Sequence, residues 1–232
     1  MCMGSVDWTE RETISAFLKY RPPQGGAHWV SCLIAVLRDA RQATGRNLNT
    51  GEVEPEEVER VGCWLGAVGY MTMFDLVGSV FKPAHAIELA GQPFIRTLQY
   101  FAPEIGEVER DALYSLRCSF VHDFSLVNVP ATGSQQARER RTHHFMLNDA
   151  DETGPIVKLP PQRWDGDLNH VRLLNATWVN LRSLGDLAEE VYKELVMLHD
   201  NGELVLALSG GLDELKRRYA MTVRPGLRLQ EP

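Results

Sequence analysis

The chain has 232 residues, of which 44% are hydrophobic and 24% charged, as in an ordinary globular protein. Its net charge of -7 argues against broad, nonspecific binding of nucleic acid but leaves room for a local basic patch. No uninterrupted apolar run reaches the roughly 20 residues that a membrane helix needs, and the first residues lack the pattern of a signal peptide. We therefore expect a cytoplasmic protein without a membrane partner.

The four cysteines, Cys2, Cys32, Cys63 and Cys118, are widely spaced and include no Cys-x-x-Cys pair. A zinc site built on thiolates is therefore not expected. Free thiols in a reducing compartment are the simplest interpretation, and they agree with a cytoplasmic location.

Four helices are predicted in the first half of the chain by apolar spacing and by start and stop signals. They are expected at about residues 9–20, 28–44, 54–81 and 92–101. The third is apolar on almost every side from Trp64 onward, so it should lie at the centre of the fold. Gly62, Gly66 and Gly69 lie nearly on one face of it and would let a neighbouring helix approach closely.

The character of the chain changes after Asn128. Val129 to Thr142 is predicted as an exposed loop, and short strands at 144–147 and 156–159 as a β-hairpin. A long helix is expected at 169–199 with a possible break at Gly185, then a helix or strand at 203–208 and a last helix at 212–221.

These elements predict a mainly α fold, a helical bundle with a small β-hairpin insertion, in a single domain spanning 1–232. Its expected parts are a core bundle at about 27–128, a loop and hairpin at about 129–161, and C-terminal helices at about 169–221.

The stretch from Asp111 to Asp123 is predicted as a further helix, with an apolar stripe along one face formed by Leu113, Leu116, Phe120 and Phe124. Glu107, Glu109 and Asp111 lie near its expected start, where the helix dipole favours anions.

Arg117 and His122 stand inside this apolar helix, where either residue is unusual without a partner or a task. Five residues correspond to about 140° of rotation, so the two side chains meet only if the long arginine swings round. Cys118 lies one turn before His122 and shares its face. The Arg-His spacing alone is common by chance, and a core histidine beside an arginine paired with an acid is the alternative.

The segment Leu113-Tyr114-Ser115-Leu116-Arg117-Cys118-Ser119-Phe120-Val121-His122 resembles the signature helix of the HEPN superfamily, in which Arg is followed four to six residues later by His. The earlier apolar helix with a single acid, Asp75 within 70–79, is similar to a helix that precedes the motif in some of its families. The resemblance covers about residues 27–128 and implies a helical bundle. Many members are metal-independent ribonucleases of toxin, antiviral or RNA-processing systems, whereas others only bind RNA or a partner. This chain has Cys118 where Asn often follows the arginine.

The chemistry of the two residues agrees with that resemblance. RNA is cleaved when its 2′-hydroxyl loses a proton and attacks the adjacent phosphate. His122 is suited to transfer protons at neutral pH, and Arg117 to stabilise charge on the phosphoryl oxygens. This reaction requires neither a metal nor another cofactor. Asp75 is a candidate for orienting Arg117 or His122, against a structural ion pair or a solvated carboxylate as the alternative.

One His in the motif helix cannot conveniently make both proton transfers, so a homodimer with a shared cleft is expected. The leading function is thus an HEPN-like endoribonuclease, as a toxin with an antitoxin partner or as a defence component. The alternatives are a non-catalytic module that binds RNA, a nucleotide or a protein, and a purely structural helical protein.

The densest basic run contains Arg138, Arg140 and Arg141, followed by His143 and His144. The three arginines are candidates for contacts with RNA phosphates, and a solvated loop is the alternative. Adjacent residues of a strand point to opposite faces, so the two histidines are not expected to bind one metal ion.

Overall fold

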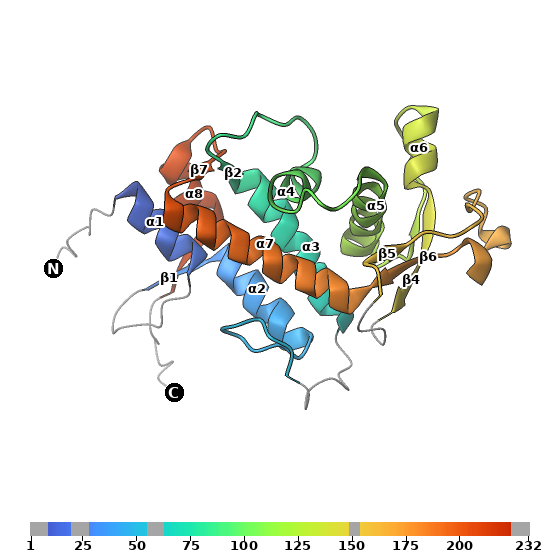
Figure 1. Ribbon diagram of the computed structural model, residues 1–232, viewed down its shortest axis with the longest axis horizontal. Helices are drawn as coiled ribbons and strands as arrows, with labels where there is room; N and C mark the ends of the chain where they lie inside the picture. The colour runs from blue at the N-terminus through green and yellow to red at the C-terminus, as the bar shows by residue number, and fades with distance from the viewer. Residues whose placement is uncertain (1–8, 20–27, 55–62, 149–153, 224–232) are drawn as a thin grey trace, which may run out of the picture.

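The computed structural model describes residues 9–19, 28–54, 63–148 and 154–223. Within them the chain is mainly helical, as predicted (Figure 1). The α-helices are α1 (Glu10–Leu18), α2 (Cys32–Ala43), α3 (Cys63–Val80), α4 (Pro93–Phe101), α5 (Glu107–Asp123), α6 (Gln135–Arg141), α7 (Leu181–Asn201) and α8 (Gly211–Tyr219).

Short strands tie distant parts of the chain together. The strands are β1 (His28–Ser31), β2 (Phe81–Pro83), β3 (Val127–Asn128), β4 (His143–Asn148), β5 (Val157–Lys158), β6 (Thr177–Asn180), β7 (Leu204–Leu206) and β8 (Ala220–Val223). β1 pairs with β8 and β2 with β7, both antiparallel. The other four form one sheet in the order β3-β4-β6-β5, which lies beside α5 and α6 at one end of the molecule (Figure 1).

The central position expected for the third helix is confirmed by α3, which contacts α2, α4, α5 and α7. Tyr70 and Phe74 of α3 have no exposed surface. A Cβ on Gly66 would lie 2.2 Å from the Thr44 methyl group, and one on Gly69 would lie 2.9 Å from the Ala40 Cβ. The glycines therefore do permit a close approach, which is made by α2; Gly62 lies outside the described residues.

By length and composition, α3 is also apolar enough to cross a membrane. Half of its residues are buried inside the fold. A central helix of a globular bundle has the same composition, because it must be apolar on most of its sides.

A buried ion pair fastens α7 to the end of α2. Arg41 donates from Nε and Nη2 to the two carboxylate oxygens of Glu189, at 2.9 and 2.6 Å, and both side chains are about 95% buried. Arg46 donates to Asp186 at 2.7 Å and packs against Gly185, where a Cβ would lie 2.8 Å from its guanidinium. Gly185 therefore marks a close contact inside an unbroken helix.

The predicted β-hairpin is wrong, because β4 and β5 do not pair with each other. Both pair with β6, β4 in parallel and β5 antiparallel. The sequence Thr177-Trp-Val-Asn180 of β6 was predicted as helix, yet its β-branched and aromatic residues suit a strand. The helix at 169–199 accordingly begins only at Leu181, after Asn180 caps it by accepting from Ser183 N–H.

Two other boundaries differ from the prediction. The segment 129–142, predicted as a loop, contains the helix α6, capped by the Ser134 side chain, which accepts from Ala137 N–H. The helix predicted from residue 28 starts at Cys32 because residues 28–31 pair with β8 and Ser31 provides the N-cap. The predicted start of the third helix, at 54–62, lies almost wholly outside the described residues.

Candidate functional site

The helix that bears the Arg-His pair, α5, begins at Glu107, four residues before the stretch predicted for it. The Glu109 side chain accepts from the Gly106 backbone N–H at 3.0 Å, which closes the first turn. Leu113, Leu116 and Phe120 have no exposed surface, which confirms most of the apolar stripe. Phe124 does not belong to it, because it is half exposed at the C-cap of the helix.

Arg117 joins the other two residues predicted to act with it. Its Nε donates to Asp75 Oδ2 at 2.6 Å, and its Nη1 donates to His122 Nε2 at 2.9 Å. The side chains of Arg117 and Asp75 are each about one-fifth exposed, and His122 is exposed. The arginine thus bridges a carboxylate on α3 and an imidazole one and a half turns along its own helix.

The contact determines the proton position on His122. A guanidinium has donors only, so Nε2 must accept, and a neutral imidazole then carries its proton on Nδ1. In this arrangement the lone pair of Nε2 points at Arg117 rather than at solvent.

Asp75 is held from a second side by the N-terminus of α4. The backbone N–H of Phe94, in the first turn of α4, lies near the Asp75 carboxylate and lowers its pKa. Gln92 occupies the N-cap position of α4 without making a side-chain capping bond. The positive end of the α4 dipole therefore lies near Asp75 and favours its negative charge.

A glycine one turn after Asp75 makes that approach possible. A Cβ on Gly78 would lie 2.0 Å from the Pro93 carbonyl oxygen, so any larger residue would push α4 away. The Thr97 hydroxyl of α4 donates to the Phe74 carbonyl at 2.5 Å and strengthens the same contact. Gly78 and Thr97 thus position the α4 amide that meets Asp75.

Burial raises the pKa of Asp75, and the hydrogen bond and charge of Arg117, followed by the Phe94 amide, oppose that rise. For Arg117, burial lowers the pKa, but the hydrogen bond and charge of Asp75 outweigh it, so the pKa is raised. The raised pKa of Asp75 favours its neutral form, whereas the raised pKa of Arg117 favours the charged form of the guanidinium. The 2.6 Å contact with Arg117 and the nearby Phe94 amide favour an ionised carboxylate at neutral pH.

Cys118 lies half-buried beside Arg117 and makes a side-chain hydrogen bond with Tyr114, one turn earlier. Burial, followed by Cys118, raises the pKa of Tyr114 to about 12. The Arg141 guanidinium lies 4.8 Å from the centre of the Tyr114 ring. Cys118 therefore lies between Arg117 and Tyr114, and Arg141 of α6 packs on the Tyr114 ring.

The three arginines proposed to bind RNA lie on α6, and each has an intramolecular partner. Arg140 pairs with Glu107, Arg141 with Asp111 at 3.2 Å, and Arg138 donates to the Pro130 carbonyl at 3.2 Å. These contacts dock α6 onto the first turns of α5. The geometry thus gives Arg140 and Arg141 a structural role, and RNA would have to compete with the acids for them.

His143 and His144 are both buried and separately engaged. His143 Nε2 lies 2.8 Å from the Arg140 carbonyl and its Nδ1 lies 2.8 Å from the Thr177 hydroxyl, whereas His144 Nε2 lies 2.6 Å from Asn175 Oδ1. No group of three potential metal ligands occurs among the described residues.

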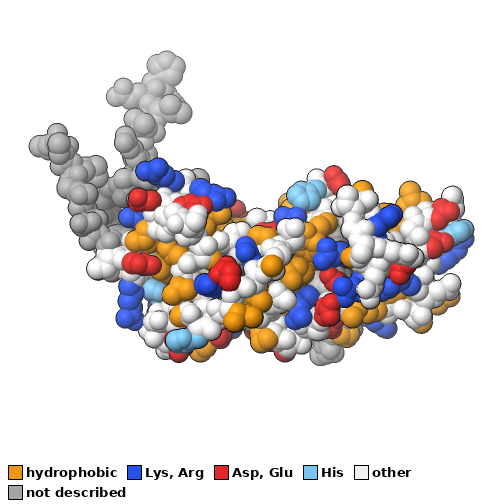
Figure 2. All heavy atoms as spheres, turned by 90° about the horizontal axis from the view of Figure 1, so that it is seen from above, with side chains coloured by type: hydrophobic (Ala, Val, Ile, Leu, Met, Phe, Trp, Pro, Cys, Tyr) orange, Lys and Arg blue, Asp and Glu red, His pale blue; other side chains and the backbone are white. Residues whose placement is uncertain are grey.

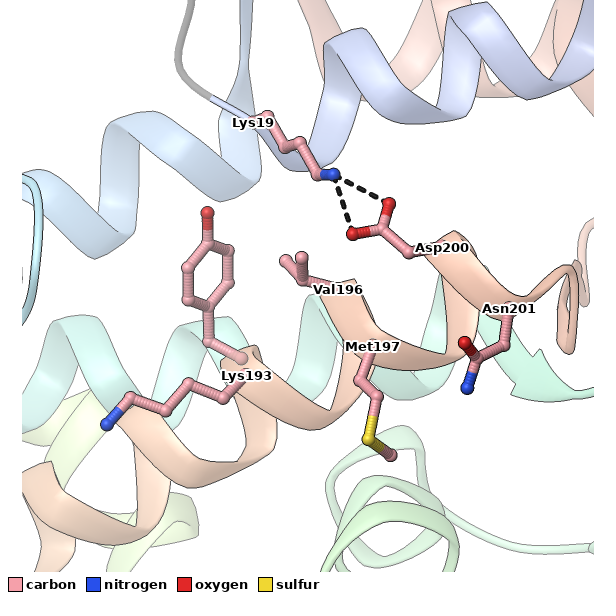
Figure 3. Close-up of a pocket in the computed structure, with 7 residues that line it drawn as sticks. Lys19, Lys193, Val196, Met197, Asp200 and Asn201 are labelled. Atoms are coloured by element: carbon pink, nitrogen blue, oxygen red, sulfur yellow. Dashed lines mark hydrogen bonds and ion pairs between the residues drawn. The ribbon is translucent and has the colours of Figure 1, made fainter.

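A cleft of about 490 Å³ lies elsewhere, between the end of α1 and the C-terminal half of α7 (Figure 3). Lys19 and Asp200 form an ion pair across it at 2.6 Å, so its most prominent charges neutralise each other (Figure 3). It is open, and its lining contains neither member of the Arg-His pair. We therefore place the candidate site at Arg117, His122 and Asp75.

The predicted site lacked several components that depend on the fold. The Phe94 amide and the close contact at Gly78 had no sequence signal, since they arise from the packing of α3 against α4. Two exposed aromatic residues near the end of α5, Trp64 and Phe124, were also missed. Trp64 was assigned to an apolar helix and Phe124 to the buried stripe.

No family model, no curated protein and no solved structure matches this chain.

Proposed function

We propose that this protein is an HEPN-like, metal-independent endoribonuclease in which Arg117 and His122 act on the phosphate that is cleaved. The observation that carries the proposal is the direct contact of Arg117 Nη1 with His122 Nε2 in a partly exposed position. It brings a phosphate-binding cation and a proton-transfer group together, as cleavage by a 2′-hydroxyl requires.

The arrangement supports a defined exchange of partners. When a phosphate oxygen replaces Nε2 as the acceptor of Arg117 Nη1, the lone pair of His122 becomes free to take the 2′-hydroxyl proton. The 2′-oxygen then forms a bond to phosphorus, and the bond from phosphorus to the 5′-oxygen breaks as that oxygen gains a proton. Asp75 holds Nε throughout, which keeps the guanidinium oriented.

The second proton transfer motivates a homodimer. His122 of a second copy would donate to the leaving 5′-oxygen, because a two-fold axis repeats every residue in the shared cleft. Analytical ultracentrifugation at micromolar concentration measures the mass, and cross-linking of single-cysteine variants near His122 locates the interface. A strict monomer, or a dimer with the two His122 residues far apart, would remove this part of the proposal.

The decisive experiment is cleavage of a mixed RNA pool in the presence of EDTA by wild type and by His122→Ala. Loss of a general acid or base lowers the rate by about 10²- to 10⁴-fold. His170→Ala is the matched control, since His170 is an exposed histidine paired with Asp165 rather than Arg117. The proposal fails if wild type and His122→Ala cleave at the same rate.

A non-catalytic HEPN-like module is the second candidate. It is favoured by the contacts that Arg117 already makes, since Asp75 accepts from Nε and His122 from Nη1. Binding of RNA or a nucleotide that requires Arg117, without any cleavage by wild type, would identify this alternative. An antitoxin or other protein partner belongs to either candidate and is tested by co-purification with products of neighbouring genes.

A further inference from the structure

Two aromatic side chains are exposed around one buried phenylalanine near the C-terminal end of α5. Trp64, in the first turn of α3, is 45% exposed, and Phe124 is 50% exposed. Both rings pack against Phe120: the centroid of Trp64 lies 5.5 Å from it and that of Phe124 lies 5.0 Å from it. We call Trp64 and Phe124 the aromatic platform.

The backbone at Phe124 is unusual. Its φ of 52° is the one positive value of a non-glycine residue in the described part of the chain. The position closes the helix with bonds from Phe124 N–H to Phe120 O and from Ser125 N–H to Ser119 O, which is the place where glycine is normally found. A bulky residue there is conformationally unfavourable, and its ring is left half in solvent. Helix termination alone does not account for a phenylalanine at this position.

Phe124 lies beside the candidate site, and Trp64 is connected to it through Phe120. Phe124 follows His122 by two residues, so their Cα atoms are at most about 7.6 Å apart. Aromatic rings next to a cation and a proton-transfer group match the parts of a nucleotide, since the rings can stack on the base while Arg117 meets the phosphate. The acidic residue at the C-terminal end of α5 is Asp123, which is exposed and would repel a phosphate.

We propose that Trp64 and Phe124 stack on an unpaired nucleobase adjacent to the phosphate held by Arg117, and so make the protein specific for single-stranded RNA. This inference rests on the proposed function. Bases in a duplex are stacked on one another and cannot present a face to these rings, whereas loops and single strands can. Stacking tolerates any base, so the platform selects unpaired structure rather than sequence.

Surface charge supports stacking over a purely electrostatic mode of binding. The net charge is -7, and Figure 2 shows basic and acidic side chains interspersed over the face that it displays. Arg140 and Arg141 are paired with acids as well. Because these two arginines are already paired, phosphate contacts through them would add little affinity. A base-stacking surface would supply affinity that phosphate contacts alone would not.

The test measures binding and cleavage of three fluorescent RNAs of equal length: a single strand, a perfect hairpin, and the single strand with one abasic position at the cleavage site. Wild type should bind the intact single strand more tightly than the hairpin or the abasic strand. Trp64→Leu and Phe124→Asn should each weaken binding to the intact strand by roughly 5- to 150-fold. Both variants should bind intact and abasic strands equally.

The variants are chosen to fold. Asparagine tolerates a positive φ better than phenylalanine, and leucine keeps an apolar side chain against Phe120. Ile87→Asn, at a residue that is 77% exposed on the loop before α4, is the control for loss of an exposed apolar side chain. It should leave RNA binding unchanged.

The outcomes separate this inference from the proposed function. RNA cleavage that depends on His122 but is unaffected by both platform variants would overturn the platform alone. Failure of wild type to bind or cleave any of the RNAs would overturn both proposals. Variants that change the sedimenting mass while retaining RNA affinity would make the platform a surface for a second copy of the chain, which also overturns the inference.

Discussion

Arg117 Nη1 lies 2.9 Å from His122 Nε2 although the two residues are five positions apart on one helix. The contact exists because Asp75 holds the guanidinium at Nε and leaves Nη1 to reach the imidazole. Three residues from two helices are thereby ordered into one chain of hydrogen bonds.

The first prediction concerns the tautomer of His122. Nitrogen NMR at neutral pH should show the proton on Nδ1, because Nε2 accepts from Arg117. In Arg117→Ala this preference should disappear, while the signals of His170, whose Nδ1 lies 2.6 Å from Asp165, stay unchanged. A proton on Nε2 of His122 in the wild-type protein would contradict the arrangement.

The second prediction is that Arg117→Lys loses activity with only a small loss of stability. An ammonium keeps the charge beside Asp75 but lacks the planar fork that reaches Asp75 and His122 together. We expect about 1 kcal/mol less free energy of unfolding, and RNA cleavage reduced by more than tenfold. Melting curves and cleavage rates measured on one preparation decide between a functional and a structural arginine. A large drop in melting temperature with cleavage intact per folded molecule would favour the structural role.

The third prediction concerns Cys118, which stands where the motif that this helix resembles often has asparagine. Cys118→Asn should fold, because the site is half-buried and already has a hydrogen-bonding partner in Tyr114. Its amide offers two donors and an acceptor beside Arg117, so RNA cleavage should increase. Cys63→Asn, at a half-buried cysteine at the start of α3, is the control. Identical cleavage by wild type and Cys118→Asn would make this position one of packing only.

The fourth prediction is a loss of stability in mild acid through His143. Burial lowers its pKa below the ordinary value, so the folded protein keeps it neutral while the unfolded chain takes up a proton. Its contribution is therefore complete above about pH 6.5 and is lost as the pH falls through that value, at up to about 1.4 kcal/mol per pH unit. Unfolding in denaturant from pH 8 to pH 5 should show this decline in wild type and a weaker one in His143→Gln.

His170 provides the opposite case for comparison. The hydrogen bond and charge of Asp165 raise the pKa of His170, so its contribution is present at low pH and lost as the pH rises. His170→Gln should therefore decline in acid at least as steeply as wild type. An equal acid dependence of His143→Gln and wild type would show that another group is responsible.

The fifth prediction concerns the buried pair of Arg41 and Glu189. Glu189→Ala should lower the free energy of unfolding by about 3–5 kcal/mol, because it leaves a buried guanidinium without its carboxylate. The double variant Arg41→Met, Glu189→Leu should recover most of that loss, since neither charge then remains buried. Glu88→Ala, which removes a 65% exposed carboxylate from its ion pair with Lys82, should have no measurable effect.

Local patterns in the sequence were sufficient for most of the helices. The α4 helix was predicted to within one residue, because Pro93 marks its first turn and a break follows Phe101. Helical spacing likewise placed Arg117 and His122 on one helix. The contact between their side chains could not be predicted, because the sequence contains no information on the direction in which the long Arg117 side chain turns.

Two errors, at β6 and at Phe124, arose where the folded structure overrode the local pattern. The four residues of β6 lie directly before a strong helical pattern, and their strand conformation depends on β4 and β5 on either side. Phe124 fitted an apolar spacing that continued past the end of the helix, but its φ of 52° turns it out of the stripe. Neither outcome follows from a window of neighbouring residues.

The pairing of β1 with β8 has a consequence for how the protein is made. These strands lie near opposite ends of the described chain, and α7, which packs on α3, is also late in the sequence. A ribosome releases α3 long before α7 exists, so the side of this apolar helix that α7 covers must wait in solution. We expect nascent chains that stop before residue 181 to aggregate or to be held by chaperones, and folding to be completed only after β8 has been made.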